Sequence, residues 1–381
     1  MTTVTYGSAF RKTYRWWLLS SVVALMALGL VMVFSASADR AARTLNDSFY
    51  FLTRQSIYIA ISLVAAFITY RISIAKIQNY STAAGIVGLI GLIVVLIPGI
   101  GVEVNGSQRW IHLGFFRLQW SEFAKLCILF FFADYIVRRH RRLTHNSFDF
   151  LKPFILVVFY IILLLAEPDF GSCVVIVATM FTLLFVARVP WGSFLLVLAV
   201  ISILGSIAIL AAPYRFQRIT AFLDPWADQF NSGYQLTQSL IAFGRGGFFG
   251  VGLGESVQKL FYLPEAHTDF VFAVIAEELG LLGIISLLVG YATLVFVILA
   301  VAQQALKQQR PFAGFVAMGI AIFFAVQVLL NLGVNMGLLP TKGLTLPLIS
   351  YGGSSLMASL MMIAIVLRVD LENSNRHARV S

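Results

Sequence analysis

The chain has 381 residues, of which 59% are apolar and only 12% are charged. Soluble domains are about one quarter charged, so this composition excludes an ordinary water-soluble fold and indicates a protein whose surface faces lipid. A net charge of +10 would suggest nucleic acid as the partner of a soluble protein. In a membrane protein, the retention of Lys and Arg on the cytoplasmic side explains the same charge, and we expect no nucleic acid partner.

Ten apolar segments follow one another along the chain, and most are long enough to cross a hydrocarbon core of about 30 Å. The sequence therefore predicts an all-α integral membrane protein, with residues 1–381 forming a single polytopic domain. The fifth and sixth segments are short, so we expect the turn between them, residues 167–171, to lie below the membrane surface inside protein. The predicted spans are 16–37, 52–70, 80–99, 119–137, 153–167, 170–187, 191–212, 269–300, 312–336 and 344–367.

The distribution of basic residues sets the orientation of these spans. An even number of spans places both termini on the same side of the membrane. If that side is cytoplasmic, the inner segments carry sixteen Lys and Arg residues and the outer segments carry ten, which agrees with the positive-inside rule. The basic run at residues 138–142 is the strongest inner anchor. We therefore predict that the N- and C-termini are both cytoplasmic.

The longest connection between spans is residues 213–268, between the seventh and eighth spans. The predicted orientation makes it a large extracytoplasmic loop, and its glycine, aromatic and amide side chains are not those of a disordered linker. Residues 369–381 form a short polar tail in the cytoplasm. Cys127 and Cys173 lie within apolar segments, so no disulfide is predicted.

Charged side chains inside predicted spans are costly and are therefore candidates for function. Glu122 and Lys125 are three residues apart in the fourth span, where they share a helix face and can pair. A neutralising structural pair explains them equally well.

Asp269 opens the eighth span directly after Glu265 and His267. A carboxylate at this position is close to water and can stay ionised, whereas Glu277 and Glu278, about two helical turns deeper, need partners or protons. The alternative interpretation of Asp269 is an acidic residue favoured by the dipole of a helix N-terminus. For the two deeper glutamates a structural role is favoured.

Three amides, Gln327, Asn331 and Asn335, form one polar stripe in the ninth span because they are four residues apart. Hydrogen bonding between helices explains such a stripe without any substrate. Residues 350–355, near the start of the tenth span, combine glycines with hydroxyl groups. Small residues let helices pack closely and also expose backbone groups to a ligand, and from the residues alone packing is favoured.

Basic residues also occur on the predicted outer side, against the topological bias. Cations held there suit an anionic partner such as a lipid diphosphate, although neighbouring acids balance most of them. With the polar groups in the spans, they indicate an outward-facing polar cavity for an acidic, amphipathic substrate, and they leave the choice between an enzyme and a transporter open. These residues are Arg109, Arg117, Arg215, Arg218, Arg245, Lys259 and Lys342.

Three long motifs resemble signatures of the SEDS family, which is named for shape, elongation, division and sporulation. They are YLPEAHTDF at residues 262–270, AEELG at residues 276–280 and LPLISYGGSS at residues 346–355. Within that family, residues 233–239 and 339–345 are more similar to the division members than to the elongation members. The resemblance covers nearly the whole chain, including the ten spans and the outer loop.

This resemblance implies a peptidoglycan glycosyltransferase that polymerises lipid II, an undecaprenyl-diphosphate-linked disaccharide-pentapeptide, into β-1,4 glycan strands. The Asp in the family's His-Thr-Asp-Phe stretch is regarded as catalytic, and here it is Asp269, the expected general base. The family elements Arg-Trp-Ile and Ser-Glu-x-x-Lys fall on residues 109–111 and 121–125. The family usually has Gln-Pro before the second element, where this chain has Gln119 and Trp120, so the fourth span lacks a helix-starting proline.

The resemblance also implies partners and a location. A class B penicillin-binding transpeptidase and other divisome proteins are expected to act with the chain in the bacterial cytoplasmic (inner) membrane at the division septum. No cofactor is required by the motifs, but a divalent cation, Mg²⁺ or Mn²⁺, could share the phosphate charge. A lipid II flippase and a divisome scaffold are the alternative functions. The expected substrate-binding residues are Arg109, Trp110, Glu122, Lys125, Arg215, Arg218, Gln235, Arg245, Glu265, His267, Lys342, Ser350, Gly352 and Ser354.

Overall fold

The computed structural model describes residues 4–104, 106–114, 116–145, 152–188, 190–210, 213–341 and 343–380. Helices make up most of this part of the chain. They are α1 (Val4–Leu45), α2 (Tyr50–Arg71), α3 (Ile74–Asn79), α4 (Ser81–Leu96), α5 (Trp120–His145), α6 (Lys152–Ala166), α7 (Phe170–Val186), α8 (Trp191–Leu210), α9 (Pro213–Leu223), α10 (Tyr234–Gly246), the π-helix η1 (Gln258–Tyr262), α11 (Val271–Lys307), α12 (Pro311–Asn335) and α13 (Gly353–Val380). The strands are β1 (Gly101–Val104), β2 (Ser107–Leu113) and β3 (Phe116–Gln119).

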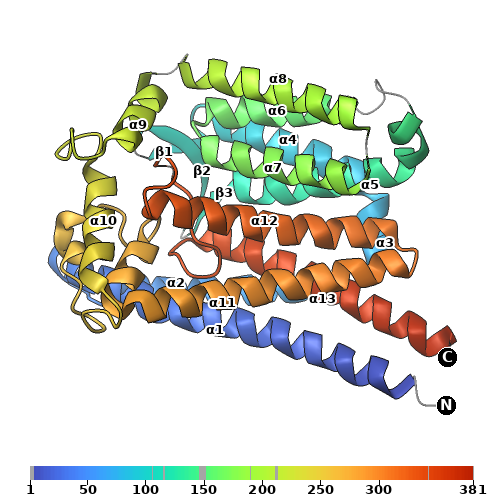
Figure 1. The fold of residues 1–381 in the computed structure, drawn as a ribbon, viewed down its shortest axis with the longest axis horizontal. Coiled ribbons are helices and arrows are strands. Elements are labelled where there is room, and N and C mark those ends of the chain that lie inside the picture. Colours follow the sequence, from blue (N-terminus) through green and yellow to red (C-terminus); the bar gives the residue numbers. More distant parts are fainter. Residues whose placement is uncertain are drawn as a thin grey trace.

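The long helices form a bundle in which both chain termini lie at the same end (Figure 1). The sheet, α9 and α10 lie at the opposite end. The shared end of the termini agrees with an even number of spans. Segment 213–268, predicted as one outer loop, contains α9, α10 and η1, and its placement outside the membrane stays a prediction from the charge distribution.

Five of the described helices are long and apolar enough to cross a membrane: Tyr14–Leu45 within α1, α2, α11, α12 and Gly353–Asn375 within α13. Three shorter apolar helices, α4, α6 and α7, accompany them. Helices α5 and α8 occupy most of the two remaining predicted spans. The chain is therefore a mostly helical protein with several membrane-spanning helices, and the count of ten spans stays a prediction.

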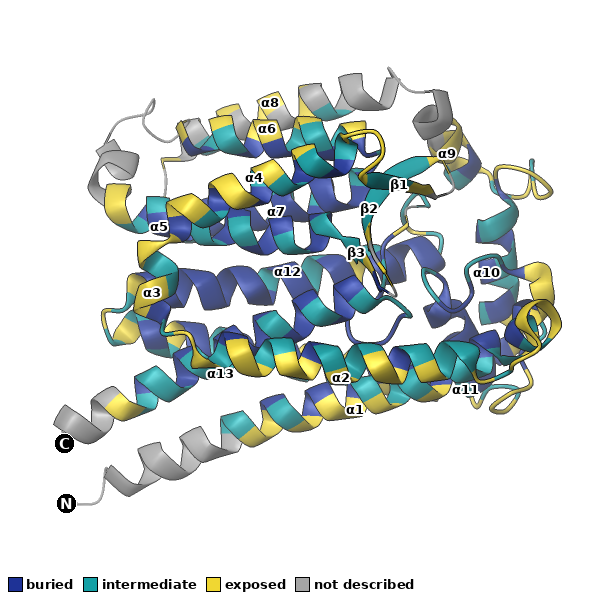
Figure 2. Ribbon diagram, turned by 180° about the vertical axis from the view of Figure 1, so that it is seen from behind, coloured by how far each residue is buried: buried dark blue, intermediate teal, exposed yellow. Residues whose placement is uncertain are grey.

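Burial separates the inner helices from those on the outside of the bundle (Figure 2). On α12, Val316, Ile320 and Phe324 are completely buried. On α2, by contrast, Val64 and Phe67 are 61% and 57% exposed. Because lipid tails are as apolar as these side chains, such exposure costs nothing in a bilayer, and it supports a lipid-facing position for α2.

The prediction of an all-α chain is wrong for residues 101–119, which form a three-stranded antiparallel sheet in the order β1-β2-β3. In this sheet Val102 pairs with Trp110. Two glycines with positive φ, Gly106 (74°) and Gly114 (65°), lie at the connections between strands. The physical cause was visible in the sequence, because an Asn-Gly pair beside β-branched residues is a strong hairpin signal.

The last helix also begins later than predicted, at Gly353 rather than at residue 344. Residues 344–352 form an irregular segment that is buried at Leu346 and Ile349. Pro347 lacks an amide hydrogen and restricts the residue before it to extended conformations. The apolar character of this segment therefore reflects burial inside the protein instead of a helix start.

Candidate active site

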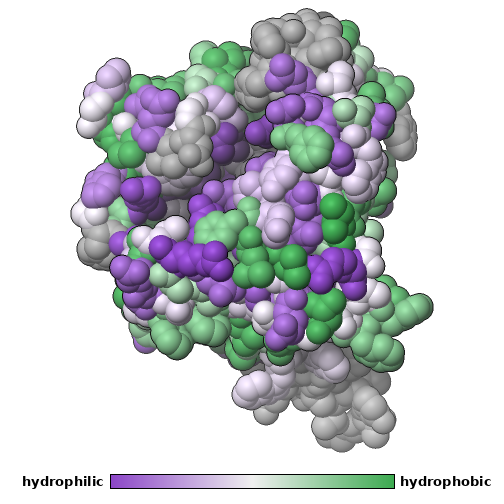
Figure 3. Space-filling model, turned by 90° about the vertical axis from the view of Figure 1, so that its left-hand side faces the viewer, coloured by the Kyte–Doolittle hydropathy of each residue, from purple (hydrophilic) through white to green (hydrophobic). Residues whose placement is uncertain are grey.

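A cavity of about 770 Å³ opens at the end of the bundle that carries the sheet. Its wall is built by α2, β2, β3, the turn before α11 and the irregular segment before α13. Figure 3 views this end and shows hydrophilic residues gathered around a hollow. The lining includes seven of the expected catalytic and substrate-binding residues: Arg109, Trp110, Arg218, Glu265, Asp269, Gly352 and Ser354.

Asp269 lies in the turn directly before α11, where it lines the cavity. Its backbone carbonyl accepts hydrogen bonds from the side-chain amides of Asn331 (3.0 Å) and Asn335 (3.1 Å) on α12. Among the described residues, none forms a hydrogen bond or ion pair with the Asp269 carboxylate. Gly343 comes so close that a Cβ there would lie 3.1 Å from Oδ2. The main chain therefore fixes this residue while its carboxylate stays open to a ligand.

The amides of α12 also hold the irregular segment before α13. The Asn331 Nδ2 group donates to the carbonyl of Leu344 (2.6 Å), and Gln327 Nε2 donates to the carbonyl of Thr345 (3.1 Å). The polar stripe thus makes hydrogen bonds between protein segments, as its structural interpretation predicted. The turn that contains Asp269 and the irregular segment before α13 are two walls of the cavity. Because the stripe bonds to both of them, it sets the distance between these walls.

The turn before α11 is tied to the segment before α13 by hydrogen bonds to its main-chain carbonyls. Ser350 Oγ donates to the carbonyl of Thr268 (2.6 Å), and the Tyr351 amide donates to the carbonyl of His267 (3.0 Å). Within the turn, Thr268 Oγ1 donates to the Glu265 carboxylate (2.8 Å), and Glu265 has a positive φ of 56°. A non-glycine residue in this region is costly, so the surrounding bonds hold the turn in a conformation it would otherwise avoid.

The pKa of Asp269 is raised to about 7, chiefly by burial and then by the negative charge of Glu265. Arg109 and Arg218 lower the pKa, and Asp169 raises it. A carboxylate with this pKa is a stronger base than an ordinary aspartate, yet it still loses its proton near neutral pH. This is the property that a general base needs.

The side chain of His267 does not share this role. Its ring packs against Phe51 (4.5 Å between ring centroids) and Tyr351 (5.6 Å), and the residue is only 5% exposed. Burial lowers the pKa of His267 to about 4, so the imidazole is neutral. His267 therefore supports Tyr351, which lines the cavity.

Arg109 of β2 links the cavity to the turn between α6 and α7. Its Nε donates to the carbonyl of Glu167 (2.9 Å) and its Nη2 to that of Pro168 (2.6 Å). Glu167 and Asp169 are 0% and 2% exposed, as expected for a turn inside protein. Burial raises the pKa of Glu167 to about 9, so its carboxyl is neutral. Two adjacent carbonyls thus orient the Arg109 guanidinium beside the cavity.

Other predicted site residues lie away from the cavity lining. Lys125 forms a buried ion pair with Glu122 (2.8 Å), with its Nζ 4.7 Å from the ring centroid of Phe323. Arg245 pairs with Glu277 (3.0 Å). Gln235, His267 and Ser350 are also absent from the cavity lining. Lys342 lies outside the described residues, and the side chain of Arg215 is not among those described.

Sequence reasoning missed the wall that α2 contributes. Tyr50, Arg54 and Tyr58 all line the cavity, and the Arg54 guanidinium lies 5.0 Å from the Tyr50 ring centroid. These residues are four apart, so they share one helix face. A charged residue within the first turn of a predicted span, flanked at this spacing by two tyrosines, was a readable signal.

In the part of the chain that the structure describes, no group of three His, Cys, Asp or Glu side chains is placed to hold a metal ion. The divalent cation that could share the phosphate charge therefore finds no such ligand set among these residues. Among the described residues, the cationic side chains that line the cavity are Arg54, Arg109, Arg117 and Arg218.

Comparison with known proteins finds a matching family and similar relatives over nearly the full length of the chain. Residues 15–375 match the model of the FTSW_RODA_SPOVE family, which is described as cell cycle protein. A probable peptidoglycan glycosyltransferase FtsW from Legionella pneumophila is 49% identical over 361 residues, covering 94% of this chain and 91% of that protein. A protein with the same description from Coxiella burnetii is 48% identical over 370 residues, covering 97% of this chain and 99% of that protein.

Two solved structures share the fold. A chain from a study of structural coordination of polymerization and crosslinking by a peptidoglycan synthase complex aligns with a TM-score of 0.78 and 31% identity, over 94% of this chain and 98% of that one. The rod shape determining protein RodA of Thermus thermophilus aligns with a TM-score of 0.69 and 30% identity, over 94% of this chain and 97% of RodA. The structural similarity thus extends over nearly the whole chain.

Proposed function

The chain belongs to the FtsW/RodA/SpoVE family of cell cycle proteins, the SEDS family that its motifs resemble, and we propose from this that it is a peptidoglycan glycosyltransferase. Its substrate in this proposal is lipid II, and its product is a β-1,4 glycan strand made at the outer face of the cytoplasmic membrane. The names of the relatives support the activity. The cavity, with one open carboxylate among several arginines, supports a substrate that combines a diphosphate with reacting sugars.

One observation carries the proposal: Asp269 is fixed through its backbone carbonyl while its carboxylate faces the cavity. A side chain that only stabilised the fold would bond to protein. Among the described residues this carboxylate has no hydrogen-bond or ion-pair partner, which supports a role toward a ligand, and its raised pKa of about 7 suits proton transfer at neutral pH.

In the proposed reaction, Asp269 takes the proton from the 4-hydroxyl of the acceptor sugar. The hydroxyl oxygen forms a bond to the anomeric carbon of the growing chain, and the bond from that carbon to the lipid diphosphate breaks. The diphosphate leaves with the electron pair of that bond. A single displacement inverts the anomeric centre, which turns an α-linked donor into a β-linked strand. General base catalysis of this kind typically contributes about 10²–10⁴-fold.

The leaving diphosphate gains negative charge in the transition state, and fixed cations stabilise such charge. Arg109 and Arg218 line the same cavity as Asp269 and lower the pKa of its carboxyl group. Arg54 and Arg117 line it as well. Guanidinium groups match phosphate oxygens in pairs of parallel hydrogen bonds, so these four residues form the proposed diphosphate site.

A lipid II flippase would need polar groups free to follow a substrate through the membrane. The deep carboxylates of Glu277 and Glu278 are instead paired with Arg245 and Lys259, and the amide stripe of α12 is engaged with main-chain carbonyls. These contacts favour the polymerase. A scaffold that only recruits partners would give no reason for an open carboxylate with a raised pKa.

The proposed setting is the bacterial cytoplasmic membrane at the division septum, where a class B penicillin-binding transpeptidase and other divisome proteins would be the partners. The apolar helices support a membrane location. The similar solved chain comes from a peptidoglycan synthase complex that coordinates polymerization and crosslinking, which supports a crosslinking partner. The division branch is supported by relatives that are called FtsW.

The test is to reconstitute the purified chain with its cognate transpeptidase in liposomes that contain fluorescent lipid II. Glycan strands longer than the disaccharide, resolved on gels, are the expected product. A parallel assay measures exposure of lipid II to an impermeant reagent on the opposite face. Transport without strand formation would overturn the polymerase in favour of a flippase, and neither activity would favour a scaffold.

A further inference from the structure

Helix α11 is broken before it enters its long apolar part. Gly280 has φ 62° and ψ −157°, which are not helical values. The part before the break, residues 271–279, is a half-helix that is buried from Val271 to Glu278. Asp269 lies two residues before its first residue. The position of Asp269 therefore depends on how this half-helix is held.

The main chain of residues 247–252 replaces the hydrogen bonds lost at the break. The carbonyls of Glu277 and Glu278 accept from the amides of Val251 (3.0 Å) and Gly252 (3.1 Å). In return, the amides of the two residues after the break donate to the carbonyls of the two residues that open the segment (3.0 and 3.3 Å). The segment thus joins the two parts of the broken helix by main-chain hydrogen bonds.

Residues 247–252 can approach the broken helix this closely only because both segments have a glycine where they meet. A Cβ on Gly280 would lie 2.3 Å from the Gly250 nitrogen, and a Cβ on Gly250 would lie 2.1 Å from the Glu278 carbonyl oxygen. Both residues also have positive φ, which glycine adopts without strain. The close approach of the two main chains is therefore encoded in the sequence.

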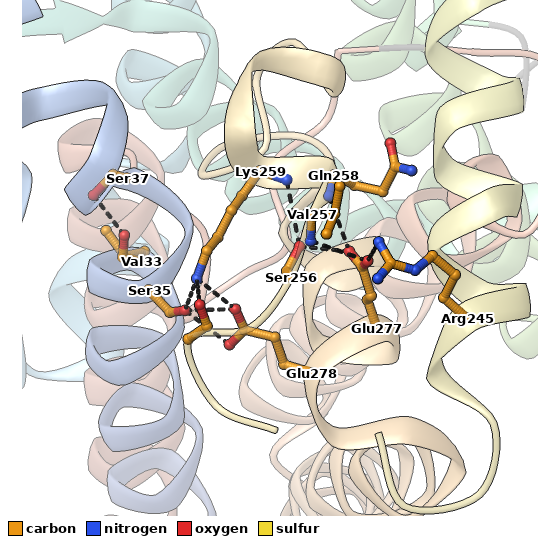
Figure 4. A network of polar contacts seen from close by, with 11 residues as sticks. Val33, Ser35, Ser37, Arg245, Ser256, Val257, Gln258, Lys259, Glu277 and Glu278 are labelled. Atoms are coloured by element: carbon orange, nitrogen blue, oxygen red, sulfur yellow. Dashed lines mark hydrogen bonds and ion pairs between the residues drawn. The ribbon is translucent and has the colours of Figure 1, made fainter. Parts of the chain in front are cut away.

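Two ion pairs fasten the same end of the half-helix from opposite sides (Figure 4). Glu278 pairs with Lys259 of η1 (2.9 Å) and accepts from Ser35 of α1 (2.7 Å). The Lys259 ammonium also donates to Ser35 Oγ (3.1 Å) and to the carbonyl of Gly254 (2.6 Å). The pair therefore joins α1, η1 and α11 at one point.

Glu277 points the other way. It pairs with Arg245 of α10 (3.0 Å) and accepts from the amides of Val257 (3.2 Å) and Gln258 (3.3 Å) and from Ser256 Oγ. Both glutamates are at most 1% exposed. We call the pairs Arg245–Glu277 and Lys259–Glu278 the double clamp.

The double clamp and Asp269 lie at opposite ends of one short, rigid element. Eight or nine helical residues separate them, which is about 12–13 Å along the axis. At the far end the amides of Asn331 and Asn335 hold the Asp269 carbonyl. Both glutamates are buried, and moving either one away from its partner would leave an uncompensated buried charge. The half-helix is therefore held at both ends.

We propose that the four residues of the double clamp, Arg245, Lys259, Glu277 and Glu278, are positioning residues that set where Asp269 stands relative to the reacting hydroxyl. None of them lines the cavity that Asp269 lines, and in this proposal they act through the half-helix. The proposal rests on the proposed function for its kinetic consequence, but the placement of Asp269 is testable by itself. It gives the two glutamates, for which the sequence favoured a purely structural role, a part in the reaction.

The decisive variant is Lys259→Met combined with Glu278→Gln. Removing one partner of a buried pair leaves an uncompensated charge, whereas neutralising both with side chains of similar size preserves the fold in many proteins. The double variant should melt within a few degrees of wild type, and its kcat for lipid II polymerisation should fall about 10- to 100-fold because small displacements at a reacting centre are costly. KM should change little. The matched control, Glu255→Gln with Lys307→Met, neutralises two exposed charges.

A second readout does not depend on polymerisation. In an Asp269→Cys background, the rate of reaction with a small, negatively charged, membrane-impermeant thiol reagent reports how residue 269 faces the cavity. The native Cys127 and Cys173 lie on apolar helices, and an Asp269→Ser chain measures their background. The double variant should change the rate at residue 269 severalfold, and the control should not.

The outcomes separate the two proposals. A folded double variant with wild-type kcat and an unchanged labelling rate would show that the clamp is structural only. A reduced kcat with an unchanged labelling rate would also overturn the positioning role. If the wild type makes no glycan, the proposed function fails, and the labelling rates still decide whether the clamp positions residue 269.

Discussion

Asn331 holds Asp269 by its backbone carbonyl and not by its carboxylate: the Asn331 Nδ2 atom lies 3.0 Å from the Asp269 carbonyl oxygen. The same amide nitrogen lies 2.6 Å from the carbonyl of Leu344. One side chain on the central helix α12 therefore joins the two walls between which a substrate would lie. It also leaves the carboxylate free, which separates the structural role of the residue from its proposed chemical one.

Replacement of Asn331 by Leu should reduce both stability and activity. The carbonyl of Leu344 would lose this donor, and an unsatisfied buried polar group costs about 1–3 kcal/mol. Asp269 would keep the bond from Asn335, so we expect about a tenfold loss of kcat and not complete inactivity. Thermal unfolding and glycan synthesis measure the two effects. Gln303→Leu, at an exposed position of α11, is the control, and equal behaviour of both variants would refute this role of Asn331.

The pH dependence of kcat/KM should report Asp269. The base acts when deprotonated, and its pKa is raised to about 7, so activity should rise with pH through neutrality. Because Glu265 raises this pKa, Glu265→Gln should move the midpoint to lower pH. Because Arg218 lowers it, Arg218→Gln should move the midpoint to higher pH. A profile that is flat between pH 5 and 8 would be inconsistent with Asp269 as the base.

Arg109→Lys should impair the enzyme although the charge is kept. Arg109 donates from two nitrogens to adjacent carbonyls (2.9 and 2.6 Å), and a lysine ammonium cannot reproduce this fork. The cation would then lose its fixed place beside the cavity. We expect at least a tenfold lower kcat/KM in a folded protein, measured with labelled lipid II. Arg71→Lys, on a helix end without such a fork, should be neutral, and a neutral Arg109→Lys would remove Arg109 from the diphosphate site.

The buried pair Glu122–Lys125 should behave as structure. Lys125→Met alone leaves a buried carboxylate without its partner, which typically costs about 3–5 kcal/mol. Lys125→Met with Glu122→Gln should recover most of that loss. Thermal unfolding in detergent compares the three chains. If the stable double variant is inactive, these residues have a direct part in substrate binding, as the family motif implied.

Part of the candidate site was predictable from local sequence. Asp269 stands where a carboxylate begins a span beside other polar residues, so both its cost in lipid and its access to water were readable. Arg54 carried a similar signal and was missed because tyrosines four residues away read as ordinary residues of a span. Its partners across the cavity, such as Tyr351, are almost 300 residues distant and leave no mark in the local pattern.

The late start of α13 shows what an apolar pattern cannot reveal. Residues 344–349 are mostly apolar, and without a structure nothing distinguishes burial in protein from burial in lipid. The side-chain amides of Gln327 and Asn331 donate to the carbonyls of Thr345 and Leu344. They replace the hydrogen bonds that these carbonyls would accept within a helix. The stripe was visible in the sequence, but its partners were not.

The break in α11 is a second case. A glycine alone is tolerated within a helix, whereas at Gly280 both the positive φ and the close approach of the Gly250 main chain require one. Pairing of residues 247–252 with the break is a contact between distant main chains, which periodicity does not record. The two adjacent glutamates beside the break were readable as costly groups, but not as the anchors of two separate segments.

The most direct test of the account compares the wild type, Asp269→Asn and Glu255→Gln, each purified with the cognate transpeptidase and supplied with labelled lipid II. Asn keeps the size of the side chain and leaves the bonds to the Asp269 carbonyl intact, whereas Glu255 is exposed in the same region of the chain. Glycan strands from the wild type and from Glu255→Gln, with none from a folded Asp269→Asn, are the predicted result. Strands made by Asp269→Asn at the wild-type rate would contradict the central role of this carboxylate.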